Sequence, residues 1–202
     1  MTKAAKRVWL TPALIFVVVL IPLIFAVLVY FHPTWFALGH TNHGQLVRPP
    51  VKITVKGLMR APTTSSPAAA QQTALPADYF AGHWTLVYIG AGSCHADCKA
   101  AMYAMRQARL ATGEHMRNVQ RLFVAPAKDA PGAGFAADWP GVTITLSSGA
   151  AGMDFMRQFT AVRPAGGIYI VDPNGLLMMT FSKHANPEGL VKDLRHLLEV
   201  NS

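Results

Sequence analysis

Two cysteines, the only ones in the chain, stand four residues apart at Cys94 and Cys98. They follow an apolar run at residues 84–90, which predicts a β-strand, and they precede residues 96–110, which predict a helix. A thiol at the start of a helix faces the positive end of the helix dipole and free N–H groups, which favour the thiolate form. Because thiolates attack disulfides and bind soft metal ions, this pair is the first candidate for chemistry.

The elements around the two thiols indicate an α/β fold. Further strands are expected at residues 119–124, 142–146, 168–171 and 176–181, with a short helix at 150–159. The last two strands flank the turn Asp172-Pro173-Asn174-Gly175, and a final helix from Pro187 carries an apolar stripe of Leu190, Leu194, Leu197 and Leu198. This order predicts a thioredoxin-like sheet flanked by helices on both faces.

The beginning of the chain predicts a single membrane anchor. Three basic residues occur within the first seven positions, and residues 8–31 carry no charge, which is enough length to cross a bilayer as a helix. Residues 37–39 are a poor signal-peptidase site, so we expect the anchor to stay uncleaved. The basic head favours the cytoplasm. The pattern therefore predicts a cytoplasmic stub at residues 1–7, a transmembrane helix at 8–31 and, in a bacterium, a periplasmic domain on the inner membrane.

The segment between anchor and domain has a different composition. Residues 51–55 alternate like a short edge strand. Residues 57–76 are rich in Pro, Ala, Thr, Ser and Gln, a composition typical of a flexible loop that builds no core. We therefore expect a periplasmic linker at residues 32–78 and the thioredoxin-like domain at residues 79–202.

The net charge of +8 could suggest nucleic acid, but the basic residues are scattered and the chain is expected to be exported. We therefore expect no nucleic-acid partner. A solvated basic surface, or attraction to anionic lipid or an acidic protein, fits better.

Several motifs in order resemble one known family. A Trp-x-Leu-x-Tyr strand at residues 84–88 leads into Cys-x-x-x-Cys, followed by a Tyr-x-Val-Asp-Pro-x-Gly hairpin at 169–175 and a Pro-x-Gly-Leu helix start at 187–190. This set resembles the Sco/SenC family, and the segment NHGQLVRPP at 42–50 is similar to a divergent proteobacterial branch found beside oxidase genes. The resemblance implies a membrane-anchored thioredoxin fold that serves copper delivery to cytochrome c oxidase.

The same resemblance implies a copper(I) site with a changed ligand set. Cys94 and Cys98 match the two copper-binding thiols of the family. Its third ligand is a histidine, and the residue in that slot here is Pro164. Pro164 also has the approximate position of the cis-proline that faces the disulfide in redox enzymes of this fold, or it is an ordinary loop proline. Two other donors stand close in sequence: His95, otherwise an exposed residue, and Met102, otherwise core filling.

Three functions follow as alternatives. The first is assembly of the cytochrome c oxidase copper site, either by binding cuprous copper or by keeping a thiol pair on an oxidase subunit reduced. The second is general thiol–disulfide exchange with another periplasmic thiol protein, with an exposed Cys94 as attacking thiol and Cys98 as resolving thiol. The third is a non-catalytic interaction module with a structural disulfide. Helical spacing places the two Cα atoms about 6 Å apart, within disulfide range. Whether the protein is an enzyme stays open.

Overall fold

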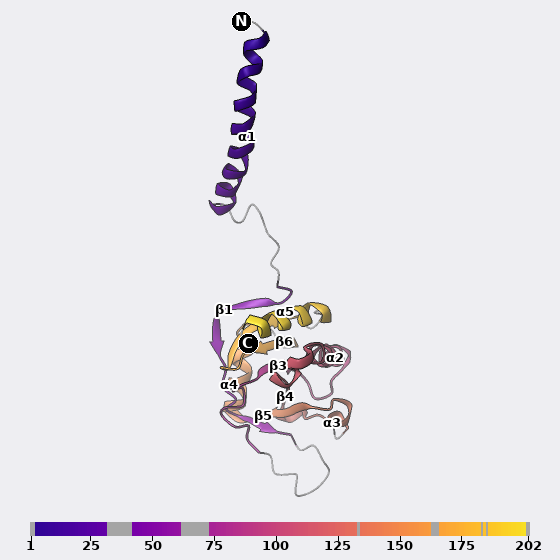
Figure 1. Ribbon diagram of the computed structural model, residues 1–202. Helices are drawn as coiled ribbons and strands as arrows, with labels where there is room; N and C mark the ends of the chain where they lie inside the picture. Colours follow the sequence, from indigo (N-terminus) through magenta and orange to yellow (C-terminus); the bar gives the residue numbers. More distant parts are fainter. Residues whose placement is uncertain are drawn as a thin grey trace. The chain divides into compact units, whose positions relative to one another are not determined.

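The computed structural model describes residues 3–31, 42–61, 73–132, 134–162, 166–182, 184 and 186–200, with side chains of the first segment described from residue 16 onward. It divides into two compact units, Met1–Thr41 and Asn42–Ser202. The first unit contains helix α1 (Lys3–Phe31), which Figure 1 shows as one continuous helix. Among the described residues, no helix combines the length and the apolarity needed to cross a membrane.

The second unit is built around one mixed sheet of seven strands. The strands are β1 (Gln45–Lys52), β2 (Leu58–Arg60), β3 (Trp84–Ile89), β4 (Val119–Pro126), β5 (Val142–Ser147), β6 (Ile168–Val171) and β7 (Leu176–Phe181). Their order in the sheet is β1-β7-β6-β3-β4-β5-β2. Strands β3, β4 and β5 are parallel, and every other pairing is antiparallel. The expected α/β, thioredoxin-like sheet is confirmed.

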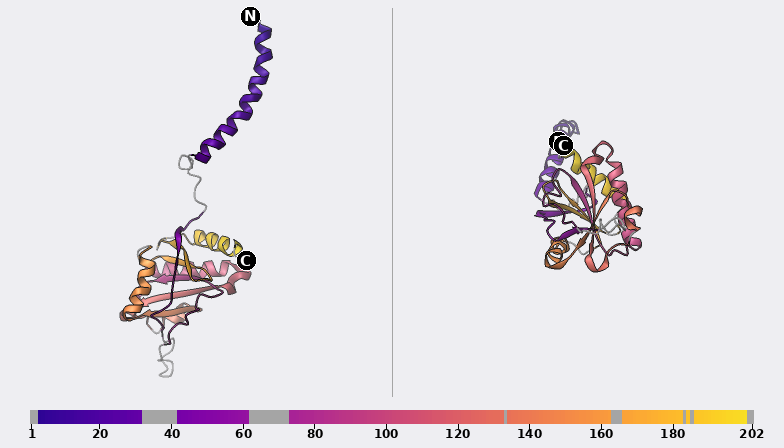
Figure 2. Two further views of the ribbon diagram at one scale, coloured as in Figure 1. Left: turned by 90° about the vertical axis from the view of Figure 1, so that its left-hand side faces the viewer. Right: turned by 90° about the horizontal axis from the view of Figure 1, so that it is seen from below.

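Helices cover both faces of this sheet (Figure 2). They are α2 (Ala96–Ala111), α3 (Phe135–Asp138), α4 (Gly149–Thr160) and α5 (Pro187–Val200), with short 3-10 turns η2 (Gly113–Asn118) and η3 (Ala127–Asp129). Helices α2 and α5 pack against each other on one face, and α4 packs on the other against β5 and β2.

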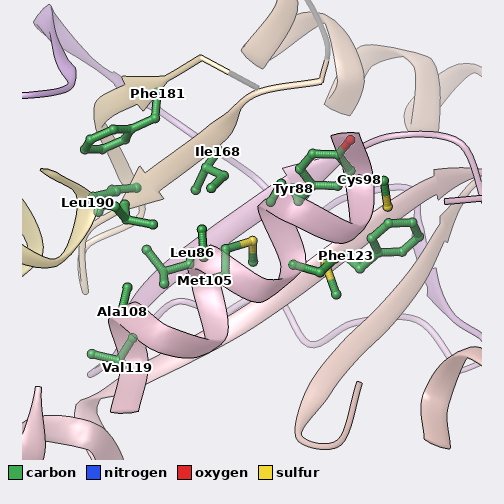
Figure 3. Close-up of a cluster of buried hydrophobic side chains, with 14 of the residues drawn as sticks. Leu86, Tyr88, Cys98, Met105, Ala108, Val119, Phe123, Ile168, Phe181 and Leu190 are labelled. Carbon is green, nitrogen blue, oxygen red and sulfur yellow. The ribbon is translucent and has the colours of Figure 1, made fainter. Parts of the chain in front are cut away.

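Each face of the sheet has its own apolar core. Side chains alternate along β3, as the two-residue period of a strand requires, with Leu86 and Tyr88 facing α2 and α5. Val87 and Ile89 face α4. All six residues of β3 are buried, which is typical of a central strand covered on both sides. Figure 3 shows the first core between α2, the sheet and Leu190 of α5.

The edge strand β1 differs in its bounds from the strand expected at residues 51–55. It covers Gln45–Lys52 and pairs with β7, with a register irregularity between Leu46 and Val51. Pro49 and Pro50 lie at this irregularity. Proline lacks the N–H that a sheet ladder needs, so it is tolerated at an edge strand or a bulge.

The compact domain also begins earlier than expected. Strand β2 lies inside the segment 57–76 and pairs with β5. Leu58 and Leu75 are buried, and the Leu75 N–H donates to the Leu58 carbonyl at 3.1 Å. These apolar side chains fill the core under α4, although the composition around them resembles a loop. The unit starting at Asn42 therefore includes two strands of the predicted linker 32–78.

A buried carboxylate fixes the start of this domain to its last helix. Asp193 of α5 is 5% exposed and accepts hydrogen bonds from the backbone N–H groups of His43 and Gly44, both at 2.8 Å. Its other oxygen lies 3.1 Å from Nδ1 of His43. The His43 side chain lies against Gly189, where a Cβ atom would approach it to 2.6 Å. The chain thus enters the domain at a defined point on α5.

Candidate functional site

The two cysteines lie where β3 ends and α2 begins, and they form a disulfide. Their Cα atoms are 5.0 Å apart, closer than the helical spacing predicted and within the usual range for a disulfide. Cys98 lies in the first turn of α2, whereas Cys94 precedes the helix at φ 39°. This left-handed conformation costs about 1 kcal/mol or more for a residue with a side chain. Cys94 therefore depends on its surroundings to hold this backbone shape.

Both cysteines are buried: Cys94 is 4% exposed and Cys98 is 5% exposed. The expectation that Cys94 is exposed at the helix mouth is wrong. Its flanking residues Ser93 and His95 are exposed, so the disulfide lies just beneath the surface.

A close backbone contact supports the turn that leads to Cys94. The Gly92 N–H donates to the Asp129 carbonyl at 3.1 Å. A Cβ atom at position 92 would lie 2.2 Å from that oxygen and 2.6 Å from backbone atoms of Ala130 and Pro131, so only glycine fits without a shift. The loop after β4 is thus packed against the segment before Cys94. Sequence reasoning missed this contact; a glycine two residues before the cysteine was the available signal.

Aromatic residues lie beneath the thiol pair. Tyr88 of β3 stacks on Phe123 of β4 with ring centroids 5.9 Å apart, and Figure 3 shows Cys98 beside both rings. Burial raises the pKa of Tyr88, and the negative charge of Asp97 in the first turn of α2 raises it further. The Tyr88 phenol therefore stays neutral near physiological pH, and the negative charge close to the disulfide comes from Asp97.

The structure places His95 and Met102 in different surroundings. His95 is exposed at the N-cap of α2, and its side chain makes no capping hydrogen bond. Met102 is completely buried in the same core as the two cysteines, one turn after Cys98. Pro164 lies outside the described residues, although Gly166, two positions on, donates to the carbonyl of Ile89 at 3.3 Å. In the described part of the chain, no three or more His, Cys, Asp or Glu side chains are placed to hold a metal ion.

The fold and the disulfide define the class: a thioredoxin-like protein with a cysteine pair at the amino end of its first domain helix. Residues 84–201 match the family described as the transmembrane-like, thioredoxin-like, C-terminal domain. Because this match covers more than half of the chain, the protein belongs to that family. A comparison with curated proteins finds no match.

Solved structures of the Sco/SenC family share this fold. Apo Sco1 from Thermus thermophilus superposes with a TM-score of 0.60 at 18% identity, covering 79% of this chain and 99% of that one. Copper-bound ScoI from Bradyrhizobium japonicum gives a TM-score of 0.54 at 16% identity, covering 71% of this chain and 98% of that one. The thioredoxin domain of a thiol-disulfide oxidoreductase from Bacteroides vulgatus gives 0.52 at 15% identity, covering 73% and 94%. The Sco/SenC-like thioredoxin fold predicted from the motifs is confirmed.

Proposed function

We propose that this protein acts through Cys94 and Cys98 in the assembly of the copper site of cytochrome c oxidase. The observation that carries the proposal is the Cys94–Cys98 disulfide at the amino end of α2, in a Sco-like fold. The position gives a thiolate the helix dipole and free N–H groups as stabilising partners. Because the pair lies just beneath the surface, only a partner that displaces the turn around Cys94 can reach it.

Thiol reduction is one route for this function. In the reduced protein the Cys94 thiolate attacks one sulfur of a disulfide on the partner, forming a mixed disulfide and releasing the partner's other sulfur as a thiolate. Cys98 then attacks the Cys94 sulfur, which releases the second partner thiolate. The partner gains two electrons and the protein is left with its own disulfide. A dithiol protein reductant must restore the reduced form.

Copper transfer is the second route, with cuprous copper as the cargo. Two thiolates whose Cα atoms lie 5.0 Å apart suit a soft cuprous ion. The Met102 thioether is the nearest additional soft donor along α2, on the same buried side as Cys98. The exposed His95, which follows Cys94 directly in the sequence, is the other candidate donor.

We further propose that the uncharged segment at residues 8–31, whose side chains the structure describes only from residue 16 onward, anchors the domain to the bacterial inner membrane, with residues 1–7 in the cytoplasm and the domain in the periplasm. Support comes from the uncharged segment at residues 8–31 and from the exposed apolar side chains of α1 from Phe16 to Phe31. An oxidising periplasm is consistent with a disulfide in the resting protein.

Copper titration and disulfide trapping test the proposal on the full-length chain in detergent. The reduced chain is expected to bind one cuprous ion, with binding lost in Cys94→Ser and in Cys98→Ser. Met102→Leu and His95→Ala identify a third donor, because only the variant that removes it weakens binding. In parallel, Cys98→Ser is expected to trap an oxidase subunit as a mixed disulfide with Cys94.

The outcomes separate the three functions. Trapping of many periplasmic thiol proteins without copper binding would favour a general oxidoreductase. If the chain binds no copper and traps no partner, and its disulfide has a strongly reducing potential, the disulfide is structural and the proposal is refuted.

A further inference from the structure

A groove lies at the same edge of the sheet as the disulfide. It has a volume of about 630 Å³ and is formed where β4 and β5 end and α4 begins. Because β3, β4 and β5 are parallel, their carboxyl ends meet at one edge, and Cys94 follows β3 at that edge. The groove borders the α4 face of the sheet, whereas the disulfide begins the helix on the other face.

The lining of the groove is mainly apolar and includes two methionines of α4. Met153 is 61% exposed, and Met156, one turn later on α4, also lines the groove. In contrast, Met102, Met105 and Met179 are at most 1% exposed in the core. Flexible thioether side chains at a surface adapt to the side chains of different peptides.

The charged groups that line the groove are all positive. Lys128 and Arg157 are its two ionisable lining residues in the described part of the chain. Arg157 also pairs with Asp154, but both side chains of that pair are largely exposed, so the pairing is weak. Helix α4 begins at the groove, has no acidic residue in its first turn, and has Ser148 as an N-cap without a side-chain capping bond. Its positive dipole end therefore adds to the two cations.

One loop connects this groove to the cysteine pair. Its first residues, Ala127 and Lys128, line the groove, and the next residue, Asp129, accepts the hydrogen bond from Gly92. Gly92 stands two residues before Cys94. A polypeptide bound in the groove would therefore contact the loop that supports the turn of Cys94.

We infer that this groove docks a segment of the protein partner that carries apolar side chains and acidic residues, and holds it beside Cys94. The inference deepens the proposed function and rests on it for the identity of the partner. Apolar side chains would pack on Met153 and Met156, and carboxylates would lie near Lys128, Arg157 and the start of α4. The positive lining disfavours a basic segment.

Peptide binding to the oxidised full-length chain tests the groove without using thiol chemistry. The probes are two short fluorescent peptides, one alternating leucine with glutamate and the other alternating leucine with lysine, measured by fluorescence anisotropy. The glutamate peptide is expected to bind more tightly. Lys128→Glu is expected to weaken it about fivefold to tenfold and to reverse the preference toward the lysine peptide. Met153→Ser is expected to weaken both peptides.

Lys192→Glu is the matched control, because Lys192 is an exposed lysine of α5 on the other face of the sheet. It makes the same change in net charge and is expected to leave both affinities within twofold of the parent. Equal binding of the two peptides, or equal effects of Lys128→Glu and Lys192→Glu, would overturn the inference. Groove-dependent binding combined with thiols inert toward any disulfide would instead keep the groove and reject the redox route.

Discussion

Gly92→Ala should both destabilise the domain and expose its disulfide. The added Cβ atom would lie 2.2 Å from the Asp129 carbonyl oxygen and 2.6 Å from backbone atoms of Ala130 and Pro131. All three contacts are with backbone, so the loop must retreat by roughly 1 Å, which breaks the hydrogen bond from Gly92 to Asp129. Overpacking costs about 1–3 kcal/mol and the lost bond about 1 kcal/mol, which gives a total of about 2–4 kcal/mol.

The control is Gly132→Ala, in the loop after β4 that Gly92 contacts. A Cβ atom at Gly132 meets nothing within 4 Å, and this position has no positive φ. The free energy of unfolding of Gly132→Ala should stay within about 0.5 kcal/mol of the parent value, or rise slightly because alanine restricts the unfolded chain. Urea unfolding of the oxidised full-length chain measures both variants.

The rate at which the disulfide is reduced tests the expected exposure of the disulfide in Gly92→Ala. Retreat of the loop lowers the cost of opening the turn around Cys94, and each 1.4 kcal/mol removed from that cost raises the rate of reduction by dithiothreitol about tenfold. Gly92→Ala should therefore be reduced faster than Gly132→Ala. If the two variants have equal stability and equal reduction rates, the loop does not support the disulfide and the reasoning is wrong.

Two further predictions concern buried polar groups. Asp193→Ala should lower the free energy of unfolding by about 2–4 kcal/mol in chemical denaturation, because two backbone N–H groups lose a buried carboxylate; Asp154→Ala, in an exposed pair, should cost less than about 0.5 kcal/mol. Ultraviolet titration against a Tyr88→Phe blank should show the pKa of Tyr88 above 10.0. In Asp97→Asn the pKa of Tyr88 should fall relative to the parent but stay above 10.0, since burial is the larger cause of the shift. The stability that Tyr88 contributes is present below pH 10 and is lost as pH rises through its raised pKa; an unchanged pKa in Asp97→Asn would contradict this coupling.

Local patterns were enough to predict the framework of the domain. The central strands are continuous apolar runs, the helices have apolar stripes at helical spacing, and the turn at Asp172 has residues with a direct local role. The Asp172 carboxylate accepts hydrogen bonds from the N–H groups of Asn174 at 2.9 Å and Leu176 at 2.7 Å, and Gly175 has φ 75°. Such features depend on neighbours in sequence, so they can be recognised without the tertiary structure.

Contacts between distant segments could not be predicted in the same way. Leu58 and Leu75 stand in a stretch with the composition of a loop, yet both are buried because β2 pairs with β5 from a remote part of the chain. The same limit explains the error about Cys94. Its position before a helix suggested exposure, but packing of the distant loop at residues 129–131 against Gly92 decides how its turn is held.

The sequence by itself determined the chemistry available to this protein: two thiols, their spacing, and their place between a strand and a helix. The tertiary structure alone decided what surrounds them. It closed the pair into a buried disulfide, placed Met102 in the core and His95 at the surface, and set a cationic, methionine-lined groove at the same edge of the sheet. The reason is physical: bonding capacity belongs to residue types, whereas burial, access and the approach of separate strands arise only when the whole sheet is assembled.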